Sequence, residues 1–393
     1  MPSAAGLKKP RVLHCITVYN DRSFAPQAIQ SAARMETTSA ECDVLVLDDT
    51  SPEPGSSEQL RDISTKLGAN YYRSPRNLGI PRNTSLGLLA AAKNGYDYVT
   101  INNSDVLFPA NLLTELLLAI RDPNVGSVTA WSNDLSMYAI TNDDPDCLND
   151  QGAVNWLGEM TSSLFSGRAI DIPGGSAFCV MIPTAVVTDV GIMDPVFDCG
   201  GNEETDWKLR SLEAGYRICL APGAFVYHWR DPAVTAGVIS RRHAAPKNEA
   251  IIDWRYPAFR SQLRKFRESD VLEPALRTLT KRIIDRAARE FGYAVDIGHR
   301  GSPLGPADDR VRIEVEIGPA DVEVRARYKG FAEQFSAGRH SIRELVVERF
   351  GMDPAVLSVY ARGAVASAVE REFKEVSIVR PHNYPTFVVT RQL

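Results

Sequence analysis

The stretch Asp97-Tyr-Val-Thr-Ile-Asn-Asn-Ser-Asp105 decides the fold that we expect for this chain. Tyr98 to Ile101 has the composition of a buried strand, and this strand runs directly into the polar residues 102–105. In α/β folds, ligands bind at the carboxyl ends of strands. We therefore expect these polar side chains to line a ligand site.

Outward from this stretch, short apolar segments alternate with helical patterns. Before it, strands are expected over 11–18, 43–47 and 69–73, with helices over 27–35, 55–67 and 84–93. After it come a helix over 111–120 and strands over 126–131, 177–182 and 216–227. This alternation predicts a doubly wound, mostly parallel sheet. Right-handed crossovers would then bring the carboxyl ends of the strands to one edge.

Composition restricts the class of protein. A net charge of −5 over 393 residues argues against a nucleic-acid partner, which usually requires a basic surface. No apolar run approaches the roughly 20 residues of a transmembrane span, and residues 1–11 lack the apolar core of a signal peptide. The six cysteines form no CxxC pair, so no zinc site or disulfide framework is predicted. We expect a cytoplasmic protein.

Three parts are expected along the chain. Residues 1–250 would form the α/β domain, with a long irregular insertion over 131–172 and a basic, loop-like segment over 229–248. Residues 251–300 read as a mostly helical basic segment. Residues 301–393 read as a small α+β module, with strands over 311–317, 322–328 and 376–379 and helices over 341–350 and 354–373.

Six motifs follow one another along the chain: ITVYN (16–20), VLVLDDTSPE (44–53), RNLGIPRN (76–83), INNSDV (101–106), GNEETDWKLRSLEAGYRI (201–218) and VYH (226–228). In this order they resemble the GT-A glycosyltransferases of family 2, especially rhamnosyltransferase-like members. The resemblance implies a Rossmann-like domain that binds a nucleoside-diphosphate sugar. A GxGxxG fingerprint is absent after the first strand, which argues against a dinucleotide-binding domain.

The resemblance also implies a donor site. Thr17, Tyr19 and either Asp48 or Asp49 would line the base and ribose, and Arg82 would meet phosphate charge. Asp105 and His228 would hold a divalent cation, Mn²⁺ or Mg²⁺, beside the diphosphate. Asn103 stands where the family's acid–x–acid motif has its first acid, so it offers a neutral oxygen in place of a carboxylate. The alternative for these residues is a structural role in turns and at strand ends.

The general base is expected in Glu203-Glu204-Thr205-Asp206. Glu204 matches the family's catalytic aspartate, although the choice among Glu203, Glu204 and Asp206 stays open. The base would take the proton of the acceptor hydroxyl as its oxygen attacks the sugar. The alternative is that acids in the first turn of a helix only complement its dipole.

The sequence thus predicts an inverting glycosyltransferase that acts on a sugar nucleotide and a hydroxyl or amine acceptor, such as a small molecule, a glycan or a natural product. A sugar-phosphate nucleotidyltransferase would need a glycine-rich, basic loop after the first strand, where this chain has Tyr19-Asn-Asp-Arg-Ser23. A degenerate transferase that binds a sugar nucleotide or glycan without turnover is the other alternative, favoured by Asn103. The C-terminal module could bind acceptor, mediate homo-oligomerisation or contact an anionic surface.

Overall fold

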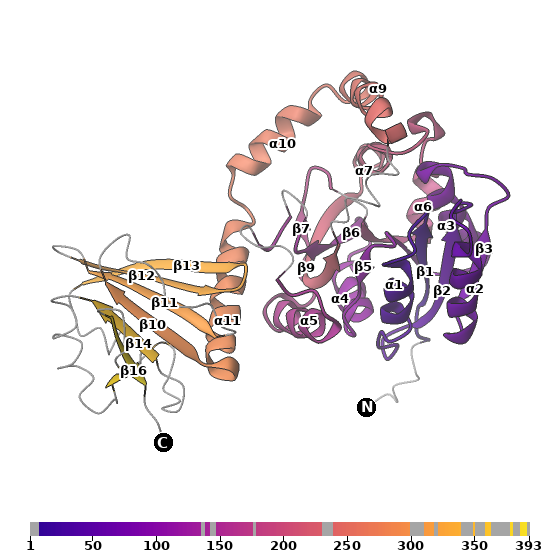
Figure 1. Cartoon of the computed structure of the whole chain (residues 1–393). Helices are drawn as coiled ribbons and strands as arrows, with labels where there is room; N and C mark the ends of the chain where they lie inside the picture. Colours follow the sequence, from indigo (N-terminus) through magenta and orange to yellow (C-terminus); the bar gives the residue numbers. More distant parts are fainter. Residues whose placement is uncertain are drawn as a thin grey trace, which may run out of the picture. The chain divides into compact units, whose positions relative to one another are not determined.

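The computed structural model describes residues 8–134, 138–141, 147–175, 178–229, 239–298, 310–317, 321–338, 349, 358–362, 378–379 and 386–390. The chain divides into two units (Figure 1). The first comprises Met1–Ile140 and Leu148–Val271, and the second comprises Thr141–Cys147 and Leu272–Leu393. The three-part division expected from the sequence stays a prediction.

The first unit is built on one sheet with the strand order β3-β2-β1-β4-β8-β6-β9-β5, and β7 pairs with β9. Strands β1 to β4 are parallel to one another, as are β6 and β9, whereas β8 runs antiparallel to both β4 and β6. This confirms the mostly parallel α/β sheet of the GT-A type. The strands are β1 (Arg11–Val18), β2 (Glu41–Asp48), β3 (Asn70–Arg73), β4 (Tyr98–Asn102), β5 (Val106–Leu107), β6 (Val125–Ser132), β7 (Ile170–Asp171), β8 (Cys179–Pro183) and β9 (Arg217–His228).

Helices cover both faces of this sheet (Figure 1). On one face, buried side chains of α1, α2 and α4 join one apolar core, whereas α3, α6 and α7 join a second core on the other face. Burial of these apolar faces supplies the main driving force for the fold. The helices of this unit are α1 (Ala25–Ala32), α2 (Ser56–Lys66), α3 (Ile80–Lys93), α4 (Leu112–Ala119), α5 (Gln151–Phe165), α6 (Thr184–Val190), α7 (Glu203–Glu213), α9 (Ile239–Arg255) and α10 (Phe259–Glu268).

Two segments that we expected to be irregular contain helices. The insertion over 131–172 contains α5. Asp150 is the N-cap of this helix, and its carboxylate accepts a hydrogen bond from Ala153 N at 3.0 Å. Its sequence includes Gly158, which permits close packing on Pro109 and which weakened the helical pattern. The loop that we expected over 229–248 is wrong in its second half, because α9 begins at Ile239 and continues through Pro246. A proline inside a helix normally argues against one.

The second unit contains α11 (Glu273–Phe291) and a sheet with the order β13-β12-β11-β10-β14-β16-β15. Most of its neighbouring strands are antiparallel, although β10 is parallel to both β11 and β14. Buried Leu279, Ile283 and Ile284 of α11 supply an apolar face, and α11 contacts β11, β12 and β13. The strands are β10 (Tyr293–Gly298), β11 (Val311–Ile317), β12 (Asp321–Tyr328), β13 (Phe331–Gly338), β14 (Ser358–Arg362), β15 (Ile378–Val379) and β16 (Thr386–Thr390).

The strands expected in this unit are confirmed at 311–317 and 322–328, and β15 covers the last residues of the strand expected over 376–379. The helix expected over 354–373 is wrong at Ser358–Arg362, which forms β14; the remainder of that helix lies outside the described residues. Pairing of β14 with β10 and β16 satisfies its backbone groups and overrides local propensity. The helix expected over 341–350 also lies outside the described residues, apart from Arg349.

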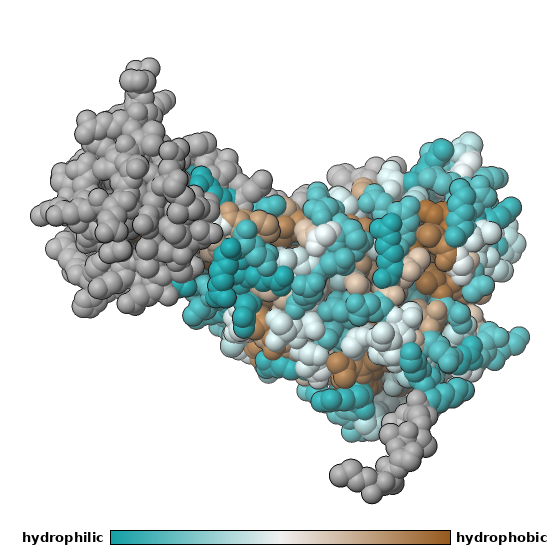
Figure 2. Space-filling model, turned by 90° about the horizontal axis from the view of Figure 1, so that it is seen from below, coloured by the Kyte–Doolittle hydropathy of each residue, from teal (hydrophilic) through white to brown (hydrophobic). Residues whose placement is uncertain are grey.

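No helix in the described ranges is long and apolar enough to cross a membrane. On the face shown in Figure 2, hydrophobic residues reach the surface in separate patches between hydrophilic ones.

Candidate functional site

A short two-stranded ribbon brings together two of the predicted site residues. Strand β5 pairs antiparallel with the end of β9, with Val106 opposite His228. Immediately before β5, the carbonyl of Asp105 accepts a hydrogen bond from Trp229 N at 2.8 Å. The side chains meet as well, because His228 Nε2 lies 3.3 Å from Asp105 Oδ1. Asn103 Nδ2 also lies 3.3 Å from His228 Nε2. The three residues predicted to face the diphosphate are therefore adjacent.

Asn133 fixes the backbone of His228. It follows β6, and its Oδ1 accepts a hydrogen bond from His228 N at 2.7 Å, while its Nδ2 donates one to His228 O at 3.1 Å. This paired contact holds the end of β9 in position as a backbone strand would. Sequence reasoning missed Asn133, although a polar residue directly after a buried strand is the signal that had identified Asn103.

The loop after β1 is tied to the same turn. Thr17 Oγ1 donates a hydrogen bond to Asn102 O at 3.1 Å. Asp21, which sequence reasoning also missed, is 1% exposed and accepts from Phe24 N at 2.9 Å. Burial raises the pKa of Asp21 and the Asp105 carboxylate adds to that effect, while hydrogen bonds from Ser104 and the backbone oppose it. The carboxyl groups of Asp21 and Asp105 therefore lie close enough to interact electrostatically.

A divalent cation fits the groups present here. Two ligand atoms bound at a right angle to one ion, with bonds of about 2.1 Å, lie roughly 3 Å apart. The separation of 3.3 Å between His228 Nε2 and Asp105 Oδ1 is close to that value. Among the described residues, however, no group of three or more His, Cys, Asp and Glu side chains could hold a metal. A cation would therefore require further oxygen ligands, from Asn103 and from a bound diphosphate.

The two predicted acids at the end of β2 both organise loops. Asp48 is fully buried and accepts hydrogen bonds from Ser51 N at 2.8 Å, from Ser57 Oγ at 2.7 Å and from Tyr71 OH at 2.7 Å. Burial acts to raise the pKa of Asp48, but these hydrogen bonds outweigh it and lower the pKa. Its carboxylate is thus a stable anion whose oxygens are already engaged.

Asp49 accepts hydrogen bonds from the backbone N–H groups of Leu78 and Gly79 at 2.7 and 2.9 Å. Burial raises the pKa of this carboxyl in spite of those bonds. Asp49 thereby holds the start of the segment 76–83 against β2. Arg82 of that segment donates to Pro195 O at 3.4 Å and lies 3.8 Å from Asp198 Oδ1. It therefore faces the loop that precedes α7.

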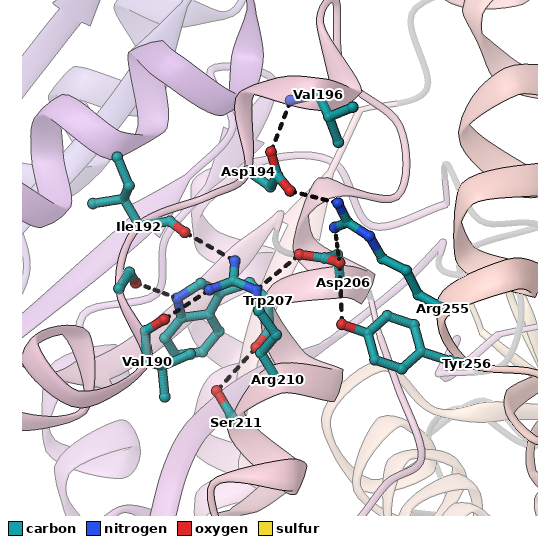
Figure 3. A network of polar contacts seen from close by, with 11 residues as sticks. Val190, Ile192, Asp194, Val196, Asp206, Trp207, Arg210, Ser211, Arg255 and Tyr256 are labelled. Carbon is teal, nitrogen blue, oxygen red and sulfur yellow. Dashed lines mark hydrogen bonds and ion pairs between the residues drawn. The ribbon is translucent and has the colours of Figure 1, made fainter.

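The three acids at the start of α7 have different environments. Glu203 is 6% exposed and accepts a hydrogen bond from Gly201 N. Asp206 is fully buried, and Figure 3 shows it between two arginines: Arg210 Nε donates to Oδ2 at 2.9 Å and Arg255 Nη1 donates to Oδ1 at 2.7 Å. Glu204 is half-buried, and no hydrogen bond or ion pair from the described part of the chain engages its carboxylate. Of the three acids, Glu204 is the most exposed.

A buried lysine lies one helical turn beyond Glu204. Lys208 is 2% exposed, and its Nζ donates to Thr129 Oγ1 and to Gly175 O, both at 3.0 Å. Burial lowers the pKa of Lys208 to about 8, and the negative charge of Glu204 partly offsets this. A lysine is almost never this deeply buried without partners. Sequence reasoning missed Lys208, because its i, i+4 spacing from Glu204 gives no information on burial.

These features define the first unit as an α/β domain of the GT-A type, with polar side chains gathered where its strands end. Residues 14–138, about a third of the chain, match the family model described as "Glycosyl transferase family 2". No curated protein matches the chain.

Three solved structures match the chain at low sequence identity and with TM-scores below 0.5. The crystal structure of GalNAc-T7 with UDP, GalNAc and Mn²⁺ is 12% identical, with a TM-score of 0.43, and the match covers 56% of this chain and 44% of that one. The mannosyltransferase PcManGT from Pyrobaculum calidifontis with GDP-Man and Mn²⁺ is 17% identical, with a TM-score of 0.47 and coverage of 74% and 79%. S. aureus TarS 1–349 is 15% identical, with a TM-score of 0.40 and coverage of 56% and 60%.

Proposed function

We propose that this protein is an inverting glycosyltransferase that moves a sugar from a nucleoside-diphosphate sugar to a hydroxyl or amine acceptor. The observation that carries the proposal is the adjacency of Asp105 and His228 at the sheet edge of a chain whose residues 14–138 match family 2. Tyr19, which is 42% exposed, is available to stack on the nucleotide base. Thr17 and the loops held by Asp48 and Asp49 form its surroundings.

In the proposed reaction, Glu204 is the general base. Its carboxylate takes the proton of the acceptor hydroxyl as that oxygen forms a bond to the anomeric carbon, and the bond from that carbon to the diphosphate breaks. Support comes from its accessibility, because Glu203 and Asp206 are buried and engaged. Arg82, which is 44% exposed, is placed in this proposal near the phosphates of the donor.

Asp105 and His228 would hold a divalent cation, preferably Mn²⁺, because an imidazole ligand suits Mn²⁺ better than Mg²⁺. Such an ion would offset charge on the departing diphosphate. Asn103 would contribute a neutral oxygen, so the ion would be held less tightly than by two acids. The rhamnosyltransferase-like character stays a prediction from sequence. The acceptor also stays a prediction and could be a small molecule, a glycan or a natural product. The role of the C-terminal module stays a prediction as well.

The alternative is a degenerate transferase that binds a sugar nucleotide or glycan without turnover, and Asn103 in place of an acid favours it. A panel of UDP, GDP and dTDP sugars, each with and without Mn²⁺, separates the two. An enzyme both gains thermal stability and releases free nucleotide when an acceptor mixture is present. A binding protein gains stability only. If no donor raises the melting temperature and none is turned over, the proposal fails.

A further inference from the structure

The loop that leads into α7 contains several residues with positive φ angles. Asp198, Gly200, Gly201 and Asn202 all have positive φ, at 50°, 99°, 97° and 74°. The two glycines adopt such angles readily, whereas Asp198 and Asn202 are held there at a cost in free energy that the surroundings must offset. Glu203 and Glu204 follow this loop directly. Whatever holds the loop therefore also sets the position of the proposed base.

Asn248 of α9 holds the loop from one side. This side chain is fully buried, and its Nδ2 donates to the carbonyls of Phe197 at 3.1 Å, Gly200 at 3.1 Å and Gly201 at 2.9 Å. These three carbonyls span the turn with positive φ. One amide group thus adds hydrogen bonds to three carbonyls of a turn whose own backbone contact runs from Gly200 N to Phe197 O at 2.9 Å.

Arg255, at the end of α9, joins the two ends of the same segment. Its Nη2 lies 2.8 Å from Asp194 Oδ2, before the loop, and its Nη1 donates to Asp206 Oδ1 at 2.7 Å, one turn into α7 (Figure 3). Tyr256 OH donates to the same Asp206 oxygen at 3.1 Å. Arg210 completes the network from within α7 and donates to the carbonyls of Val190 and Ile192. The segment 194–206 is therefore clamped at both ends and in the middle by residues 248–256.

We propose that Asn248 and Arg255 are positioning residues, which act through the backbone and Asp206 to hold the Glu204 carboxylate where it can accept the acceptor's proton. This inference rests on the proposed function, because it takes Glu204 as the base. Both residues lie far beyond the region that matches the family model, which ends at residue 138. They neither touch the reacting atoms nor line the nucleotide pocket in this scheme.

The test compares Asn248→Ala and Arg255→Met with the wild type and with Arg260→Met. Arg260 is a matched control, because it also pairs with two acids, Asp253 at 2.8 Å and Glu249 at 3.9 Å, but away from the loop. A displacement of the base by about 1 Å costs roughly 100-fold in rate. We therefore expect kcat to fall about 10- to 100-fold in the two test variants, with donor affinity within about twofold of the wild type. Arg260→Met should keep the wild-type kcat.

A double-mutant cycle distinguishes positioning from general weakening of the fold. If Arg255 acts through Glu204, then Arg255→Met should cause no further loss in a Glu204→Gln background. An equal loss in both backgrounds, or wild-type kcat in both test variants, would overturn the inference. Should Arg255→Met fail to fold, Arg255→Lys and Asn248→Ala give the same comparison. Absence of turnover by the wild type would instead contradict the proposed function itself.

Discussion

Replacing Asp206 by asparagine removes a buried charge while the shape of the side chain is kept. The wild-type carboxylate accepts hydrogen bonds from Arg210, Arg255 and Tyr256. Asparagine offers one acceptor oxygen and directs its NH₂ group at a guanidinium that can only donate. At least one arginine therefore loses its hydrogen bond to residue 206, and both lose the negative charge of that side chain.

The expected cost follows from burial. Breaking a buried ion pair by removing one partner typically costs about 3–5 kcal/mol. The side chains of Arg210 and Arg255 are 26% and 27% exposed and retain other acceptors, so the lower end applies. We expect a loss of about 3 kcal/mol, which for a unit of this size lowers Tm by roughly 6–10 °C.

Tryptophan fluorescence gives a selective readout for this experiment. All five tryptophans of the chain (131, 156, 207, 229 and 254) fall in the first unit. Trp207 lies beside Asp206 and donates from Nε1 to Gly191 O at 2.8 Å. Urea unfolding followed by fluorescence should therefore show a lower midpoint for Asp206→Asn. An unchanged midpoint together with lost turnover would refute the reasoning and make Asp206 a candidate base.

Three further predictions concern other groups. Burial lowers the pKa of Lys208 to about 8 in the native state, against 10.5 when unperturbed. Between these pH values the unfolded chain binds more protons than the native one, so the free energy of unfolding rises with pH. Measured by urea unfolding relative to Lys208→Met, the wild type should gain about 3 kcal/mol from pH 8 to 10.5. In Gly79→Ala, the new Cβ would stand 2.3 Å from Asp198 O at a φ of +76°, so steady-state kinetics should show kcat reduced roughly tenfold or more. Asp105→Ala should weaken Mn²⁺ binding in the presence of nucleotide about tenfold or more by calorimetry; an unchanged affinity would place the ion elsewhere.

The sequence predicted the elements of the central sheet because their signals are local. The strand expected over 11–18 is a short, mostly apolar run bounded by turn residues, and β1 spans Arg11–Val18. Helix α9 escaped prediction because Pro246 interrupts its pattern, and β14 because its partners β10 and β16 are distant in sequence. Tertiary pairing decides such segments.

In the candidate site, too, local motifs could be predicted from the sequence and contacts between distant segments could not. Asp105 and His228 were expected to meet because their motifs resemble a known family, and the structure brings them within 3.3 Å. The residues that hold the α7 loop could not be predicted, because Arg255 meets Asp206 across 49 positions of sequence. No local pattern distinguishes such an arginine from a solvated one. For the same reason, the sequence could not separate Glu204 from the neighbouring acids.

The proposed sugar transfer depends most directly on Glu204 acting as its general base. The measurement is the rate of nucleotide release by the wild type and by Glu204→Gln, each saturated with a donor whose binding has been measured on both. We predict equal donor affinity and a rate lower by about 10²–10⁴-fold in the variant, the contribution typical of a general base. Equal rates at equal donor occupancy would contradict the account.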